Sequence, residues 1–231
     1  MDWPGAAERD ILWLSLKVGL WAALLSLLPA VAAAWLLVRV RFPGRTVLNA
    51  LVHAPLVLPP VVVGYLMLLL FGVKGPLGSW LNEVFGVRLV FTSAGAVLAS
   101  SVMGFPLMVR AIKLALEGVN RDLEFAARSL GASRWDAFAT ITLPLIVPGL
   151  LAGFLMAFAA SLGEFGATIT FASNIEGATR TLPLAIYSAA QTPGGDALAL
   201  RLVLMSMALA LAALMLSDWL ERRSRRWLDG I

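Results

Sequence analysis

Side chains that could carry out catalysis are scarce in this sequence. The chain has no cysteine and a single histidine, His53, so it offers neither a thiolate metal site nor a histidine pair. His53 stands among apolar neighbours, which is typical of a packing residue. There is no Gly-x-x-x-x-Gly-Lys-Ser/Thr phosphate-binding loop, so we expect any ATP to be hydrolysed by another protein. The sequence predicts a protein that is not an enzyme and that holds neither a cofactor nor a metal ion.

Glu164 is the most unusual ionisable residue, because it follows a long apolar run. An acid inside a membrane is costly and is by default a functional candidate. A carboxylate would repel an anion, so we predict a structural or gating role, with Glu164 paired to an arginine or to a backbone N–H. The Thr168 hydroxyl can donate to an oxyanion. The predicted pathway or gate residues in this segment are Gly163, Glu164, Phe165, Gly166 and Thr168.

A second candidate for the pathway is a break in an earlier apolar run. Pro59 and Pro60 lack backbone donors and interrupt a helical hydrogen-bond ladder, and Gly64 follows them. Broken membrane helices are tolerated where the released carbonyls face protein or a cavity. We assign these three residues to the pathway or gate; a kink that serves only helix packing is the alternative.

Residues 117–140 are too polar to cross a membrane, although they lie between two runs that can. Asn120 can cap a helix, and Gly131 is the residue type that commonly ends one in the left-handed conformation. Ser133 with Asp136 resembles a second helix cap. The sequence therefore predicts two short helices joined by a glycine elbow.

The first of these short helices carries a narrow apolar stripe, with residues at helical spacing. The stripe consists of Leu123, Ala126, Ala127 and Leu130. Its alanines allow another backbone to approach closely. From physics alone, an amphipathic connector on the membrane surface is the alternative to a docking loop. The candidate functional residues of the loop are Glu124, Ala126, Ala127, Leu130, Gly131, Arg134 and Trp135.

Long apolar segments indicate an all-α integral membrane protein with one transmembrane domain over residues 1–231. Hydrophobic residues make up 60% of the chain and charged residues 14%, whereas soluble domains are about 45–50% apolar. Each segment can cover a hydrocarbon core of about 30 Å. The five predicted spans are 11–38, 46–73, 94–116, 141–162 and 198–220.

Basic residues are distributed unequally between the two sides of the predicted membrane. Of the 18 Lys and Arg residues, twelve fall on the side of the 117–140 loop and the arginine-rich tail. The positive-inside rule places that side in the cytoplasm and the amino terminus outside. The basic residues therefore orient the chain, and we expect no nucleic-acid partner. A sixth span over 164–191 is possible but would move the tail outside, so we prefer a partly inserted external loop.

The spacing within the 117–140 loop and just beyond it resembles the EAA loop of bacterial ABC-importer permeases. Ala126 and Ala127 are followed by three residues and Gly131, then by nine residues and the sequence Ile-Thr-Leu-Pro at 141–144. In that family the loop is cytoplasmic and docks on an ATP-hydrolysing subunit. This chain departs from the pattern at Phe125, which stands where the family has glutamate.

Because of that departure, Glu124 lies one residue early. A helix turns about 100° per residue, so the Glu124 side chain should point away from the direction of the family glutamate.

Four further strings, at 55–64, 105–112, 161–170 and 191–195, resemble the molybdate permeases of the sulfate/molybdate importer group. The LGEFGAT string is shared with sulfate permeases, whereas LPPVVVG and QTPGG favour molybdate. The resemblance implies the type I importer permease fold in a bacterial inner membrane. It also implies a homodimeric pore, two ATP-binding cassette subunits on the cytoplasmic side and a periplasmic molybdate-binding protein. A sulfate or tungstate permease of the same group is the alternative.

A secondary transporter is the alternative from a different class. Coupling to protons or ions needs titrating groups along a buried path, and the predicted span interiors carry almost none. The sequence shows no inverted repeat. We therefore expect a permease that is surrounded by membrane lipid and driven by a separate ATPase.

Overall fold

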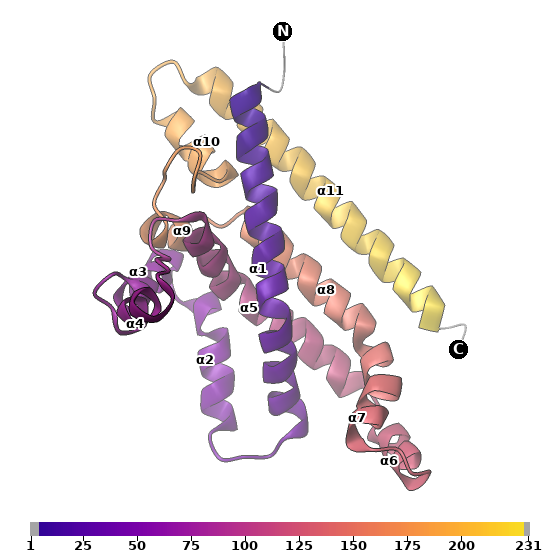
Figure 1. Cartoon of the computed structure of the whole chain (residues 1–231). Coiled ribbons are helices and arrows are strands. Elements are labelled where there is room, and N and C mark those ends of the chain that lie inside the picture. Colours follow the sequence, from indigo (N-terminus) through magenta and orange to yellow (C-terminus); the bar gives the residue numbers. More distant parts are fainter. Residues whose placement is uncertain (1–4, 229–231) are drawn as a thin grey trace.

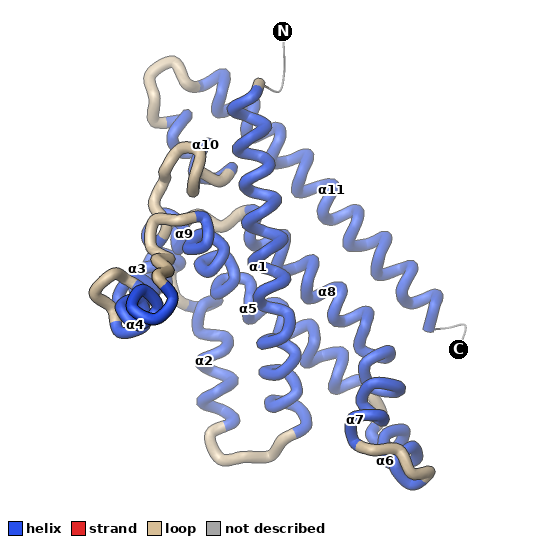
Figure 2. Tube along the Cα trace, in the orientation of Figure 1, coloured by secondary structure: helices blue, strands red, loops and turns tan. Residues whose placement is uncertain are grey.

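The computed structural model describes the backbone of residues 5–228 and the side chains of residues 5–216 and 219. Every regular element in that part of the chain is helical (Figures 1 and 2). The long helices are α1 (Ala6–Arg39), α5 (Ser93–Gly118), α8 (Leu143–Leu162) and α11 (Asp196–Leu228). The shorter elements are α2 (Arg45–Val57), α3 (Pro60–Phe71), α4 (Pro76–Phe85), α6 (Arg121–Ser129), α7 (Arg134–Ala137), the π-helix η1 (Phe138–Thr142), α9 (Gly166–Phe171) and α10 (Leu182–Ala190).

The predicted spans correspond to helices whose ends differ from the predicted ends by a few residues. Within the described residues, four continuous helical stretches are long and apolar enough to cross a membrane: Ala6–Arg39, Ser93–Gly118, Arg134–Leu162 and Asp196–Leu216. A fifth span is reached if α2 and α3 are counted together. The all-α prediction is thereby confirmed. The four arginines of the tail, Arg222, Arg223, Arg225 and Arg226, lie outside the described side chains.

The predicted span 46–73 is divided in two. Helices α2 and α3 meet at an angle of 118°, so the structure has a sharp turn where the sequence predicted an interruption within one span. Pro59 and Pro60 occupy the turn, and Pro60 is the first residue of α3. Two consecutive prolines remove two backbone donors and fix φ near −65°, which stops one helix and favours the start of the next.

Small residues hold α1, α5 and α8 together as the centre of the fold. Ala23, Ala30 and Ala34 of α1 are fully buried in the same cluster as Met108 of α5 and Ile146 of α8. Without large side chains between them, helix backbones can approach closely and gain dispersion contacts in an apolar solvent. The loops at both ends of the bundle connect to these three closely packed helices.

Residues 164–191 form two short helices, α9 and α10. The longer of these, α10, has nine residues and therefore rises about 14 Å, less than half of a hydrocarbon core. The structure thus has no sixth span here. Helix α4 was not predicted from the sequence. Its boundary signals are nevertheless ordinary ones: Pro76 is its first residue, and Gly86 follows its end in the left-handed conformation.

The polar connections gather at the two ends of the bundle. The turn between α1 and α2 and the loop carrying α6 and α7 lie at one end, at the bottom of Figure 1. The start of α1 and the turn between α10 and α11 lie at the other end. The two segments that the charge pattern grouped on one side of the membrane are therefore close together in space.

Candidate functional site

The loop between α5 and α8 is built as the sequence predicts. The Asn120 side chain accepts a hydrogen bond from the Asp122 N–H at 2.9 Å and caps α6. Gly131 has φ +98°, the left-handed conformation of a glycine elbow. Two hydrogen bonds close this end of α6: the Gly131 N–H donates to the Arg128 carbonyl and the Ala132 N–H to the Ala127 carbonyl, both at 3.1 Å. The elbow is thus a Schellman motif.

The second short helix, α7, begins with the predicted cap. The Ser133 hydroxyl accepts from the Asp136 N–H at 3.1 Å, and the Asp136 carboxylate accepts from the Ser133 N–H at 3.1 Å. This reciprocal capping box satisfies donors that would otherwise be unpaired at a helix start. Both short helices therefore have defined ends.

A π-helical turn, η1, connects α7 to the long helix α8. The Leu143 N–H donates to the Phe138 carbonyl, five residues back. Pro144 has no N–H to offer the carbonyl four residues earlier, and its ring crowds that carbonyl, which favours a wider turn at this point. Such turns are frequent at functional sites. Here the turn joins the loop to the span.

Glu124 faces the helix bundle and ties the loop to two other segments. Its carboxylate accepts a hydrogen bond from Arg39 of α1 at 3.0 Å and another from the Thr142 hydroxyl at 2.7 Å. The Arg39 side chain is 8% exposed and that of Glu124 is 22% exposed. Glu124, which lies one residue before the position of the family glutamate, thus forms an ion pair with Arg39 of the same chain.

Two more contacts attach the loop to the end of α1. The Arg121 guanidinium donates to the Val38 carbonyl at 3.1 Å. The rings of Trp35 and Phe138 meet edge to face, with centroids 5.1 Å apart. Arg39, Arg121 and Thr142 were not identified from the sequence as partners of the loop. No local pattern links them, because Arg39 precedes Glu124 by 85 residues.

The other predicted loop residues are mostly at the surface. Leu130 is 90% exposed and Trp135 is 80% exposed. Ala126, Gly131 and Arg134 are exposed as well, and Ala127 is half-buried. Large apolar side chains that protrude from a polar loop usually mark a surface for another protein or for lipid. The structure thus separates Glu124, which anchors the loop, from an exposed set that is available for contact.

We expect Glu124→Ala to loosen the attachment of the loop to α1 and to destabilise the solubilised protein by about 2 kcal/mol. Removing one partner of a fully buried ion pair costs about 3–5 kcal/mol, and the partial exposure of Glu124 reduces that figure. Thermal unfolding in detergent measures the change. Asp122→Ala is the matched control, because Asp122 is an exposed acid of the same helix and its side chain has no ion pair in the described residues. Equal melting temperatures for the two variants would contradict the anchoring role.

The two predicted pathway segments meet in the structure. A Cβ atom added to Gly64 of α3 would lie 2.8 Å from the Ala167 carbonyl oxygen of α9. One added to Gly166 would lie 2.7 Å from Cβ of Pro60. The backbones of α3 and α9 are therefore in direct contact, which only glycine permits at these positions. Pro59 directly precedes α3 and Gly163 lies three residues before α9, and both residues are exposed.

Glu164 caps the short helix α9. It is 8% exposed, and its carboxylate accepts a hydrogen bond from the Ala167 N–H at 2.7 Å. Of the two partners that the sequence suggested, the backbone N–H is the one observed, and Glu164 has no ion pair in the described residues. Phe165, beside it, packs on Tyr187 with ring centroids 5.1 Å apart. These contacts fit a structural role for Glu164.

Two buried hydroxyls near Glu164 have no hydrogen-bond partner in the described part of the chain. They belong to Ser161 and Thr168, which are 5% and 1% exposed. A buried hydroxyl without a partner costs free energy, so these two are the groups of this region best able to donate to a passing oxyanion.

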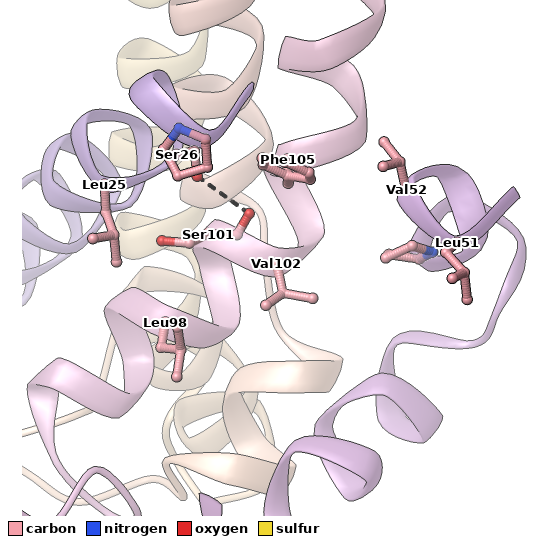
Figure 3. A pocket seen from close by; sticks show the side chains of 10 residues that line it. Leu25, Ser26, Leu51, Val52, Leu98, Ser101, Val102 and Phe105 are labelled. Carbon is pink, nitrogen blue, oxygen red and sulfur yellow. Dashed lines mark hydrogen bonds between the residues drawn. The ribbon is translucent and has the colours of Figure 1, made fainter. Parts of the chain in front are cut away.

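An apolar cavity of about 410 Å³ lies between α1, α2 and α5 (Figure 3). Its two hydroxyl residues, Ser26 and Ser101, are already occupied: Ser26 donates to the Ala22 carbonyl at 2.8 Å and Ser101 to the Val97 carbonyl at 2.7 Å. Figure 3 shows the further bond that links the two serines. A cavity whose polar groups are satisfied by backbone offers nothing to a hydrated dianion. We therefore exclude it from the anion pathway.

Comparisons with known proteins agree with this architecture. The family of binding-protein-dependent transport system inner membrane components matches residues 23–226. The molybdenum transport system permease protein ModB of Escherichia coli K12 is 58% identical over 94% of this chain and 95% of its own length. The sulfate transport system permease protein CysT of the same organism is 42% identical over 67% of this chain and 55% of its own length.

A solved structure gives the fold independently. A crystal structure of a bacterial ABC transporter that imports the acidic polysaccharide alginate matches with a TM-score of 0.75, at 17% identity, over 95% of this chain and 80% of the other. At that identity the likeness concerns the fold alone. From the family match and the extent of the identity, the chain belongs to the binding-protein-dependent transport system inner membrane components, within the molybdenum transport permeases.

Proposed function

We propose that this chain is the transmembrane permease subunit of an ATP-driven importer that carries molybdate across the bacterial inner membrane. The observation that carries the proposal is the identity of 58% to a molybdenum transport permease over 94% of the chain, against 42% to a sulfate permease over 67%. The loop geometry agrees with it. A permease of this kind needs a surface on which the ATPase subunit can dock, and the exposed loop that carries α6 and α7 provides one.

The chain supplies the path and its partners supply the energy. We infer two copies of the chain, two ATP-binding cassette subunits and a periplasmic molybdate-binding protein. The ATPases dock on the coupling loop, residues 117–140, through the exposed side chains of Ala126, Leu130 and Trp135. Ala127 and Gly131 shape the helix and its end, and Arg134 adds a positive charge beside them.

The pathway runs past the contact between α3 and α9. Pro59, Pro60 and Gly64 lie on one side of it, and Gly163, Phe165 and Gly166 on the other. Support comes from the backbone contact at the two glycines and from the unpartnered Thr168 hydroxyl. In this arrangement Glu164 holds the start of α9 in place. It does not contact the anion, because a carboxylate would repel a dianion.

Uptake by the reconstituted complex tests the function. Proteoliposomes that contain the permease, its ATPase and its binding protein should accumulate molybdate when ATP is supplied, and should do so faster than sulfate. Tungstate should resemble molybdate, because both are tetrahedral dianions of nearly the same size. A complex that imports sulfate in preference to molybdate would assign the chain to the other branch of the group. Uptake that requires an ion gradient and not ATP would indicate a secondary transporter.

The proposed orientation predicts which positions can be labelled from outside. Because the chain has no cysteine, single cysteines report accessibility without background. A membrane-impermeant thiol reagent added to intact cells should label Ser79→Cys in α4 and leave Ser133→Cys in the coupling loop unlabelled. After permeabilisation both variants should react. External labelling of Ser133→Cys would contradict the proposed orientation and would place the coupling loop outside the cell.

A further inference from the structure

A cationic pocket of about 280 Å³ lies between the coupling loop and the end of α1. Four arginines and one carboxylate line it: Arg39, Arg121, Arg128, Arg134 and Glu124. Positive charge therefore exceeds negative charge by three, and the loop acids Asp122 and Asp136 are not part of the lining. This excess attracts an anion that the described residues do not provide.

Three of these arginines have unused donors. The Nε of Arg39 is buried and has no hydrogen-bond partner, although another nitrogen of that side chain binds Glu124. Within the described residues, the guanidinium groups of Arg128 and Arg134 make no hydrogen bond or ion pair. Guanidinium groups bind phosphate through two parallel N–H donors, so a phosphate group suits such a set.

An apolar groove continues from this pocket along α1. It has a volume of about 710 Å³ and is lined by Leu28, Val31, Ala32 and Leu36 of α1, together with the loop. Trp35, Arg134 and Phe138 line both the pocket and the groove, so the two are continuous. From Leu28 to Leu36 the groove follows eight residues of a membrane span, about 12 Å towards the bilayer centre.

We propose that pocket and groove together bind one anionic phospholipid, with its phosphate among the arginines and one acyl chain along α1. A water-soluble phosphate or a carboxylate of a partner protein would use the pocket alone. The groove adds a surface that faces hydrocarbon and gains nothing from water. Basic pockets beside membrane spans are known to bind anionic headgroups. The site goes beyond the proposed transport function and does not depend on which oxyanion is carried.

Lipid binding to the full-length chain in detergent micelles tests the site. Native mass spectrometry follows the retention of dioleoyl phosphatidylglycerol and dioleoyl phosphatidylcholine. Micelles are used because they lack the surface potential of a bilayer, which would attract basic residues without a specific site. We expect one phosphatidylglycerol per chain at concentrations where phosphatidylcholine is not retained. The double variant Arg128→Gln/Arg134→Gln should weaken this binding about 30-fold, since loss of one hydrogen bond to the phosphate weakens binding by a factor of about five. Both residues are exposed, and Arg39 is left intact to preserve the loop anchor.

Three single variants distinguish the contribution of the charge from that of the groove. Arg41→Gln is the matched charge control: Arg41 is exposed at the same end of the bundle but lines neither cavity, so binding should change less than about twofold. Ala32→Phe fills the groove without a change of charge and should weaken binding of the dioleoyl lipid. Ala32→Leu adds a smaller side chain, so it still tests the groove if the phenylalanine variant does not fold. Its effect on lipid binding should be intermediate.

Several results would overturn the assignment. Unchanged binding in the double arginine variant means that there is no such site. Normal binding in both Ala32 variants, together with displacement of the lipid by millimolar inorganic phosphate or molybdate, identifies a soluble-oxyanion site instead. If adding the ATPase subunits releases the lipid from the wild-type chain, then the pocket belongs to the protein interface. Retention of the lipid in the assembled complex supports the proposal.

Discussion

Replacement of Gly131 by valine should reduce ATP-driven transport about tenfold or more while the chain still inserts in the membrane. Gly131 has φ +98°, and a residue with a Cβ pays about 1–2 kcal/mol in the left-handed conformation, a β-branched residue more. No atom lies within 4 Å of a Cβ added there, so the cost comes from the backbone and not from crowding. The loop would lose the elbow geometry, and both short helices would be misdirected with respect to the proposed ATPase partner.

Gly131→Asn provides the matched control for this experiment. Asparagine is polar and branched in a similar way, but it adopts the left-handed conformation far more readily than valine does. Uptake by proteoliposomes of the complete complex should therefore remain close to wild type for the asparagine variant and fall for the valine variant. The interpretation fails if the two variants transport equally well.

Gly64→Ala should lower the melting temperature of the solubilised permease by about 2–10 °C. The new methyl group would lie 2.8 Å from both the Ala167 carbonyl oxygen and Cβ of Thr170. Because one neighbour is backbone, α3 and α9 must move apart, and overpacking of this kind costs about 1–3 kcal/mol. The same movement would open the contact between the two proposed pathway segments, so the transport rate should change as well.

Gly118→Ala is the control for the contact between α3 and α9. Gly118 is also a helical glycine, but no atom lies within 4 Å of the added Cβ. Alanine there should be neutral or slightly stabilising, because it favours the helix by up to about 1 kcal/mol over glycine. A Gly64→Ala protein as stable as the Gly118→Ala protein would show that the helices are not held at this distance.

Local chemistry explains the parts of the structure that could be predicted. The ends of the spans follow from the lengths of apolar runs, and the loop follows from Asn120, Gly131 and Ser133, each of which acts on neighbours within three residues. Even the break at Pro59 and Pro60 was predictable, since it depends on two missing donors. The angle of 118° was not, because α3 packs against α9, which lies about a hundred residues away in the sequence.

The unpredicted contacts depend on partners far away in the sequence, whereas the boundary signals of the missed helix α4 are local. Gly64 and Gly166 are separated by about a hundred residues, and nothing local in either segment specifies the other. The ion pair between Arg39 and Glu124 is of the same kind. The sequence showed Glu124 displaced by one residue from the family pattern, but it could not identify Arg39 as its partner. Residue types thus identified the candidate positions, and only the fold assigned their partners.

The contacts with α1, of which the Glu124 ion pair is one, attach the coupling loop to a third helix, whereas the covalent chain joins it to two. A force applied at Trp135 reaches α5 and α8 through the backbone and α1 through Arg39. A loop held at two points can swing about the line that joins them; a third point off that line removes this freedom. In the proposed function, a stroke delivered by an ATPase would therefore displace three packed helices together, with little lost to rotation of the loop.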